Sequence, residues 1–315
     1  MIRIGLDIGG TGIKIGAVDE NNRILAEDSI PTRIDIPFED QVQLMTDCVQ
    51  KLLNPAVHPS LTMDQVASIG AGIPGIADAD GVVIDCTNLR WRYTPLRREF
   101  QKRIDKPFFV DNDANVAALA ESVAGSSAGA SSSVFITLGT GIGSGIILNG
   151  KIWKGAHHIG AELGHMILEL NGQPCTCGNH GCVEQYCSAT ALIRMAREQA
   201  AIHPETRILA LAEGDPGKIN AKIVCDAVRE GDDVAAKVFR RYVFCMSQMI
   251  AGIINLLDPE MIILGGGVSK AGNLLLDPIR AEFPKYVLFN DQPMPEVVIA
   301  TLGAEAGIIG AAMLS

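Results

Sequence analysis

The sequence predicts an α/β protein with two related α/β domains, and three observations lead to this prediction. The chain has 315 residues, enough for about two domains of roughly 150 residues each. A unit of strand, glycine turn, strand, polar turn and strand occurs at residues 2–28 and again at residues 134–153. Apolar residues at helical spacing predict helices at about residues 38–54, 114–124, 221–231, 234–257 and 303–314.

The strands of the first half are indicated by apolar alternation and by the turns that end them. Apolar side chains alternate over residues 2–8 until Gly9, Gly10 and Gly12 interrupt the pattern. Proline and glycine at positions 74 and 75 end a later apolar run in the same way. The strands expected in this half lie at residues 2–8, 13–17, 23–28, 66–73, 82–84 and 107–110.

The second half repeats the opening pattern after a joint. Residues 125–133 (GSSAGASSS) are small and polar, which is typical of a loop or a flexible connection. A strand at 134–138 then leads into the glycine turn 139–145, and Asn149-Gly150 predicts a tight hairpin before residues 151–153. A third apolar strand at 261–264 is followed by three consecutive glycines.

Composition and charge exclude several classes of function. Lysine and arginine number 26 against 36 aspartate and glutamate, a net charge of −10, which disfavours a polyanion-binding surface and so a nucleic-acid partner. Aromatic residues make up 5% of the chain, which gives few platforms for base stacking. No apolar run approaches a bilayer-spanning length and the N-terminus lacks a signal-peptide pattern. We therefore expect a cytoplasmic protein without a membrane partner.

Three glycine turns that each follow an apolar strand predict a nucleotide site. They contain Gly9, Gly10 and Thr11; Thr140 and Gly141; and Gly265, Gly266 and Gly267. Glycine exposes backbone N–H groups that can surround phosphate oxygens, although a plain hairpin would explain any single turn. The pattern is neither a Walker A loop nor a clean dinucleotide fingerprint.

Asp7 ends the first strand beside its glycine turn. A carboxylate next to phosphates requires a cation, which implies Mg²⁺, and the alternative is an aspartate that caps the turn.

Asp111-Asn112-Asp113 lies at the predicted start of the helix 114–124. The field of a helix N-terminus favours an ionised carboxylate, which would keep Asp113 ready to accept a proton. An ordinary N-cap is the alternative interpretation. A substrate site is also consistent with this segment, because two aspartates and an asparagine lie together at the end of an apolar strand.

The region 155–187 contains the most specific chemical pattern. Cys175, Cys177 and Cys182 are clustered, and His165 lies ten positions before the first of them. Three thiolates and one imidazole form the closed tetrahedral ligand set of a structural zinc site. A disulfide or unused thiols are the alternatives, and a reducing compartment disfavours the disulfide.

Two glutamates lie close to these ligands in the sequence. Glu162 is three residues before His165, and Glu184 is two residues after Cys182. Carboxylates fixed next to a rigid metal loop are suited to bind the hydroxyl groups of a polyol. Exposed surface glutamates are the competing interpretation.

The motifs together resemble the ROK family of sugar kinases, over essentially the whole chain. The matching segments are DIGGTGIKIG (7–16), GIPG (72–75), VDNDAN (110–115), LGTGIGSG (138–145), GAELGH (160–165), CTCGNHGCVE (175–184) and ILGGG (263–267). The resemblance implies an actin-like ATPase (ribonuclease H-like) fold with two α/β domains around a central cleft. It also implies a small N-terminal domain at residues 1–112, joined by the C-terminal helix at 301–315, and a large domain with the zinc loop at 113–300.

The resemblance implies a role for each candidate residue. Asp113 is expected to be the catalytic base that takes the proton from the attacking sugar hydroxyl. The residues expected to bind the sugar are Gly72, Asn88, Asn112, Asp113, Glu162, His165 and Glu184. Those expected to bind Mg·ATP are Asp7, Gly9, Gly10, Thr11, Thr140, Gly141, Gly265, Gly266 and Gly267. His165 is expected to serve both zinc and sugar through different ring nitrogens, and a phosphate contact by Lys14 is doubtful.

The activity implied is that of a glucokinase of glycolysis, which transfers phosphate from ATP to the 6-hydroxyl of glucose. Other hexoses and N-acetyl sugars of the same family are alternatives: N-acetylglucosamine, N-acetylmannosamine, mannose, allose and fructose. A sugar-sensing regulator without turnover and a sugar-independent ATPase are alternatives of other classes. Because the glycine turn already begins near residue 7, no DNA-binding domain is expected before it, and the family implies a homodimer.

Overall fold

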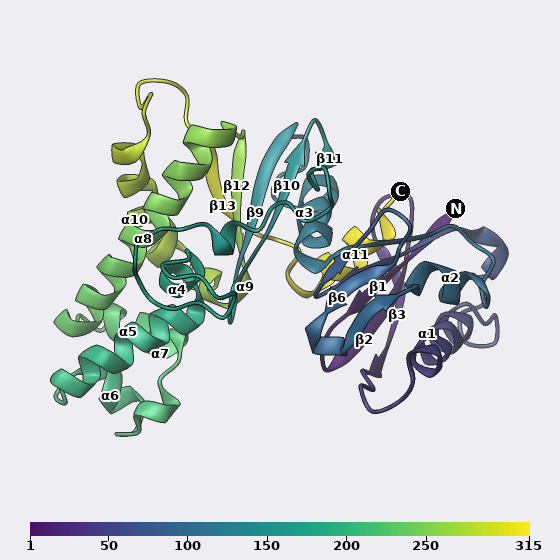
Figure 1. Ribbon diagram of the computed structural model, residues 1–315, viewed down its shortest axis with the longest axis horizontal. Helices are drawn as coiled ribbons and strands as arrows, with labels where there is room; N and C mark the ends of the chain where they lie inside the picture. The colour runs from purple at the N-terminus through teal and green to yellow at the C-terminus, as the bar shows by residue number, and fades with distance from the viewer. The chain divides into compact units, whose positions relative to one another are not determined.

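The computed structural model describes all residues 1–315, which form two compact units (Figure 1). Unit 1 comprises Met1–Ser131, Gly145–Ala161 and Thr301–Ser315, whereas unit 2 comprises Ser132–Ser144 and Glu162–Ala300. The C-terminal segment therefore belongs to the same unit as the N-terminus. The helix 113–124 also falls in unit 1, and the sequence-based domain boundary at residue 112 stays a prediction.

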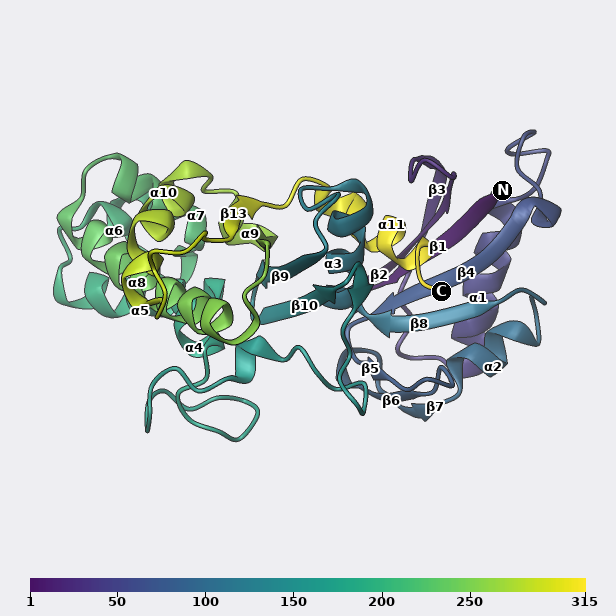
Figure 2. The same cartoon turned by 90° about the horizontal axis from the view of Figure 1, so that it is seen from above.

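A five-stranded sheet forms the centre of unit 1, with strand order β3-β2-β1-β4-β8. Its strands are β1 (Ile2–Ile8), β2 (Gly12–Val18), β3 (Ile24–Pro31), β4 (Val66–Ile73) and β8 (Phe108–Asn112). β1, β2 and β3 form an antiparallel meander, and β1, β4 and β8 run parallel to one another. Figure 2 shows β1, β4 and β8 side by side.

The second sheet repeats this strand order as β11-β10-β9-β12-β13. Its strands are β9 (Ser132–Leu138), β10 (Ile142–Leu148), β11 (Lys151–Ile152), β12 (Met261–Gly265) and β13 (Glu296–Ile299). β9, β12 and β13 are parallel neighbours, as their counterparts are in the first sheet. The internal repeat expected from the sequence is therefore confirmed at the level of topology.

The helix α11 (Ala306–Ala312) packs directly on β1 and β4 in unit 1 (Figures 1 and 2). A Cβ atom on Gly5 would lie 1.9 Å from the carbonyl oxygen of Ile308, and one on Gly70 would lie 1.9 Å from that of Ala311. Only glycine allows a helix backbone to approach the strands so closely. The C-terminal helix is thus part of the core of unit 1.

The remaining elements of unit 1 cover or extend the sheet. They are α1 (Phe38–Leu52), β5 (Ile76–Ala77), β6 (Val83–Cys86), β7 (Trp91–Thr94), α2 (Leu96–Gln101) and α3 (Asp113–Ala124). α1 packs against β2 and β3 and fully buries Val42, Met45 and Val49, whose spacing places them on one helix face. β5, β6 and β7 form a separate three-stranded sheet.

Helices make up most of unit 2. They are α4 (Glu184–Cys187), α5 (Ala189–Ile202), α6 (Arg207–Leu211), α7 (Ala221–Arg229), α8 (Asp233–Leu257), α9 (Gly266–Ser269) and α10 (Asn273–Glu282). α8 contacts α4, α5, α7 and α10, and its buried Tyr242 donates a hydrogen bond of 2.6 Å to the carbonyl oxygen of Cys187 (Figure 1). No helix has the length and apolar character that spanning a membrane requires.

A buried carboxylate in α3 connects three stretches of unit 1. Glu121 is fully buried, and its two oxygens accept hydrogen bonds from backbone N–H groups of Ser126, Thr301 and Leu302 at 2.7 to 3.0 Å. The hydroxyl groups of Ser126 and Thr301 donate to it as well. A Cβ atom on Gly125 would lie 2.1 Å from this carboxylate, so the turn after α3 closes tightly around it.

Candidate functional site

The parallel strands of unit 1 bring three predicted segments to one edge of the sheet. Asp7 on β1 lies opposite Gly72 on β4, and Gly72 lies opposite Asp111 on β8. All three positions are at the carboxyl ends of their strands, where ligands bind in open α/β sheets. Gly72 is buried, and a Cβ atom there would lie 3.3 Å from Val116 of α3.

The start of α3 separates the roles of Asn112 and Asp113. Asn112 is the N-cap, since its side-chain oxygen accepts hydrogen bonds from the N–H groups of Ala114 at 2.9 Å and Asn115 at 3.4 Å. Its amide group also donates to the carbonyl oxygen of Gly75. Asp113 is the exposed first residue of the helix. The capping role therefore belongs to Asn112, and the carboxylate of Asp113 lies in the stabilising field of the helix N-terminus.

Asp111 is buried and is paired with a lysine from a distant segment. The Nζ atom of Lys154 lies 2.6 Å from one oxygen of Asp111, while the side-chain amide of Asn115 donates to the other oxygen at 2.9 Å. The pair fixes the loop after β11 to the end of β8. No sequence motif indicates this partner, since a lone lysine in a loop matches none.

Asp7 is partly buried and closely packed. Burial raises the pKa of the Asp7 carboxyl, and the charge of Lys14 on the neighbouring strand acts in the opposite direction. A Cβ atom on Gly307 of α11 would lie 2.5 Å from the carboxyl carbon. A carboxylate that has lost part of its hydration is a favourable ligand for a divalent cation, which restores the missing electrostatic stabilisation.

The first glycine turn is closed by its own backbone. The N–H group of Gly9 donates to the carbonyl oxygen of Gly12 at 2.9 Å, and the hydroxyl of Thr32 donates to the carbonyl oxygen of Gly9 at 2.6 Å. Gly10 and Thr11 are exposed at its tip. A Cβ atom on Gly10 would lie 3.6 Å from the Cβ atom of Asn88, so this predicted sugar residue is next to the turn.

The two glycine segments of unit 2 also lie together. Gly265 on β12 pairs with Thr137 on β9, so both strands end at the same edge. Gly266 has a φ of +82°, and a Cβ atom there would lie 2.6 Å from the backbone nitrogen of Leu138. The segment Gly265–Gly267 therefore packs onto the start of the turn that contains Thr140 and Gly141.

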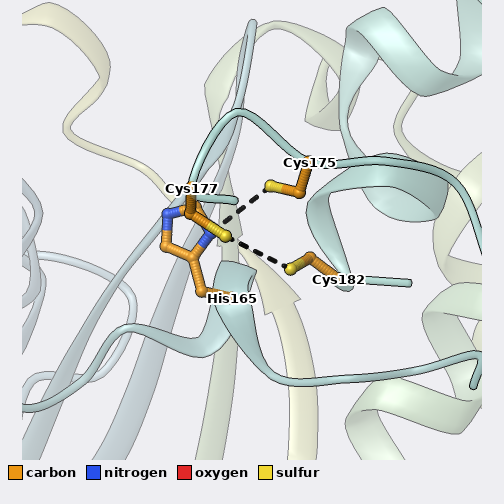
Figure 3. Close-up of side chains that lie close together, drawn as sticks. All are labelled: His165, Cys175, Cys177 and Cys182. Atoms are coloured by element: carbon orange, nitrogen blue, oxygen red, sulfur yellow. Dashed lines mark hydrogen bonds between the residues drawn. The ribbon is translucent and has the colours of Figure 1, made fainter. Parts of the chain in front are cut away.

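His165, Cys175, Cys177 and Cys182 converge on one point (Figure 3). Their ligand atoms all lie within 4.8 Å of one another. The sulfur atoms of Cys177 and Cys182 are 3.6 Å apart, and the sulfur of Cys175 is 3.7 Å from Nδ1 of His165. A tetrahedral zinc ion, with Zn–S of about 2.3 Å and Zn–N of about 2.0 Å, requires S···S and S···N separations of roughly 3.8 and 3.5 Å. The four residues therefore fit zinc.

The pKa values of two thiols in this cluster are shifted in opposite directions. Burial acts to raise the pKa of Cys175, but hydrogen bonds from Cys177, His165 and Cys182 outweigh it and lower that pKa to about 6. Burial, together with its thiol neighbours, raises the pKa of Cys182 to about 12. The lowered pKa makes the thiolate of Cys175 easier to form, which favours binding of a cation.

The two glutamates near the cluster differ in their surroundings. Glu162 is exposed and directly precedes the short helical turn Leu163–His165. Glu184 is partly buried at the start of α4, and one of its oxygens accepts a hydrogen bond of 3.0 Å from the N–H group of Ile142. Glu184 therefore lies beside the glycine turn of unit 2, a contact that its sequence position did not indicate.

The comparisons with known proteins agree with one another. The ROK family profile matches residues 3–315. A glucokinase from Halalkalibacterium halodurans is 38% identical over 99% of this chain and 94% of its own length, and one from Thermotoga maritima is 36% identical over 99% and 96%. The crystal structure of a ROK family glucokinase from Streptomyces griseus, in complex with glucose and AMPPNP, is 37% identical. It has a TM-score of 0.80 and covers 99% of this chain and 98% of that chain.

Proposed function

Because the chain belongs to the ROK family and has its actin-like ATPase fold, we propose that it is an ATP-dependent glucokinase that phosphorylates the 6-hydroxyl of glucose. The observation that carries the proposal is the full-length similarity to a glucokinase solved with glucose and an ATP analogue. Curated glucokinases at 36% and 38% identity support the same substrate.

Asp113 is the proposed general base. Its carboxylate takes the proton of the 6-hydroxyl while the sugar oxygen attacks the γ-phosphorus of ATP. A bond forms between that oxygen and phosphorus, and the bond from phosphorus to the bridging oxygen of ADP breaks. The N-terminal field of α3, which has 12 residues, supports the ionised form of Asp113 before the transfer.

The remaining candidate residues position the two substrates. Sugar hydroxyl groups are bound by Gly72, Asn88, Asn112, Glu162, His165 and Glu184 in this proposal. Phosphate and adenosine groups are bound by the turns with Gly9, Gly10 and Thr11, with Thr140 and Gly141, and with Gly265, Gly266 and Gly267. Phosphoryl transfer depends mainly on such positioning and on charge neutralisation.

Two metal ions complete the proposal. Asp7 would hold Mg²⁺, which neutralises phosphate charge when bound, and the partly desolvated state of its carboxylate supports this role. His165, Cys175, Cys177 and Cys182 would hold a structural Zn²⁺ that fixes the loop between Glu162 and Glu184. With Nδ1 of His165 directed at the thiols, Nε2 is left to face the sugar.

The cellular setting is proposed with the function. A cluster of three thiols that binds zinc requires a reducing compartment, which supports a cytoplasmic enzyme. We further propose a homodimer, which light scattering coupled to size-exclusion chromatography would test. A monomer at micromolar concentration would contradict the dimer and leave the catalytic proposal unaffected.

An ADP-release assay with Mg·ATP and a panel of hexoses and N-acetyl hexosamines tests the substrate. We expect the highest kcat/KM with glucose. Preference for an N-acetyl sugar would overturn glucose as substrate, and ADP release without any sugar would favour an ATPase. No turnover across the panel would contradict the kinase proposal and favour a sugar-sensing regulator.

The variant Asp113→Asn tests the base. We expect kcat to fall by at least 10²-fold, the lower range for a lost general base, while glucose still binds. Asp105→Asn is a matched control, because this aspartate is exposed in a loop of the same unit. Turnover of Asp113→Asn at the level of Asp105→Asn would refute the assignment.

A further inference from the structure

The glycine turn at residues 139–142 is held by the junction between α4 and α5. The N–H group of Ala189 donates a hydrogen bond of 2.9 Å to the carbonyl oxygen of Gly139. The hydroxyl of Thr190 donates one of 2.7 Å to the carbonyl oxygen of Thr140. With the bond from Ile142 to Glu184, three polar contacts connect three turn residues to residues 184–190.

Packing around Gly141 shows how closely the two segments fit. A Cβ atom at this position would lie 2.2 Å from a carboxylate oxygen of Glu184. The space that a side chain would need is therefore occupied by the glutamate. Any larger residue at position 141 would push the turn away from the junction.

The junction itself is fixed from several sides. Ser188 caps α5 by accepting a hydrogen bond of 3.0 Å from the N–H group of Ala191, which defines where the chain changes direction. The carbonyl oxygen of Cys187 accepts the buried hydroxyl of Tyr242 from α8. Residues 189 and 190 are therefore presented to the turn by a rigid support.

These contacts determine the orientation of two peptide groups. In a trans peptide the C=O and N–H bonds point in opposite directions, and the chain contains no cis peptide bond. The carbonyl of Gly139 points toward the junction because it accepts the hydrogen bond from Ala189, so the N–H group of Thr140 in the same peptide points away from the junction. The carbonyl of Thr140 accepts the hydrogen bond from Thr190, so the N–H group of Gly141 points away from it as well. Two successive N–H groups directed to one side form the kind of nest that binds phosphate oxygens.

We propose that Thr190 is a positioning residue for nucleotide binding, acting through the peptide group between Thr140 and Gly141. Glu184 supports the same turn through the hydrogen bond that its carboxylate accepts from Ile142. The inference rests on the proposed function in one respect only, which is that this turn binds phosphate. A net hydrogen bond contributes about 0.5–1.5 kcal/mol, so losing it should weaken nucleotide affinity about three- to tenfold.

The test compares Thr190→Val with Thr190→Ser by calorimetric titration of the full chain with Mg·AMPPNP. We expect the Kd of Thr190→Val to rise about three- to tenfold. Thr190→Ser, which keeps the hydroxyl, should stay within about twofold of the wild type. The Kd for glucose should be unchanged in both variants, and the Tm of Thr190→Val should fall by no more than a few degrees, the effect of one exposed hydrogen bond. Steady-state kinetics should show a raised KM for ATP and an unchanged KM for glucose.

Three outcomes would overturn the inference. Thr190→Val could bind Mg·AMPPNP as tightly as the wild type does. It could instead lose as much affinity for glucose as for the nucleotide and also have a strongly lowered Tm, which would indicate a merely structural role. The wild type could also fail to bind Mg·AMPPNP, so that the turn is not a phosphate site. A wild type that binds the nucleotide but phosphorylates no sugar refutes the proposed function and leaves this inference intact.

Discussion

Replacing Glu121 by glutamine should destabilise unit 1 strongly. Three backbone N–H groups and two hydroxyl groups donate hydrogen bonds to this fully buried carboxylate. An amide NH₂ group in place of either oxygen would face at least one backbone N–H group, so at least one hydrogen bond is lost, and the remaining ones weaken because the amide oxygen is uncharged. Each bond to a charged acceptor contributes about 1.5–3 kcal/mol. With partial relaxation we expect the free energy of unfolding to fall by about 3–5 kcal/mol.

Differential scanning calorimetry measures the effect. A loss of this size corresponds to a decrease in Tm of about 6–20 °C for a unit of 150–250 residues. Glu27→Gln is the matched control, because Glu27 is an exposed residue of β3 in the same unit, and its Tm should stay within about 2 °C. A Tm for Glu121→Gln equal to that of the control would refute the reasoning that this carboxylate connects the stretches of unit 1.

Three further outcomes are expected. Cys177→Ser removes one of the four proposed zinc ligands, so zinc measured by mass spectrometry should fall well below one ion per chain, and an unchanged zinc content would contradict the site. Burial acts to raise the pKa of Asp232, but hydrogen bonds from Ala235, Arg207 and Thr206 outweigh it and hold that pKa below its unfolded value. Asp232 then contributes stability above about pH 4, and this stability is lost as the pH falls through the folded-state pKa. The Tm of Asp232→Asn should therefore decrease less steeply than that of the wild type as the pH is lowered. An equal decrease of the Tm in both proteins would disprove this. Gly70→Ala should lower the Tm by several degrees because its Cβ would lie 1.9 Å from a carbonyl oxygen of α11, whereas Gly252→Ala, with open space around it, should keep or raise the Tm.

The sequence predicted the parts of the fold that depend on local pattern. Alternating apolar residues and glycine turns located β1, β2, β9 and β12, and the repeat anticipated the shared strand order of the two sheets. α10 was not predicted, since Pro278 lies inside it and normally indicates a break. β13 has four residues and follows a proline-containing loop, too little for a periodic signal. No helix was predicted at α5 either, although its alanine-rich sequence favours one.

The residues of the candidate site also differ in how far the sequence predicts them. The candidate residues that belong to motifs could be predicted from the sequence, and the structure brings the four proposed metal ligands within 4.8 Å of one another. The residues that hold those motifs in place were not found. Lys154, Glu121 and Thr190 act through contacts with segments 43 to 181 positions away along the chain. Such pairs leave no periodicity or spacing in a single sequence.

The position of α11 has a consequence for the order in which the protein folds. The strands of the first sheet leave the ribosome before unit 2, but the helix that covers β1 and β4 is made after it, within Thr301–Ser315. Unit 2 lies almost entirely between them in the chain and can form its own core during that interval. One face of the first sheet therefore stays uncovered until residues 301–315 have been made, and the closing contact joins segments that are far apart in the chain. The nascent chain should be most prone to aggregation, and most dependent on chaperones, before this helix emerges.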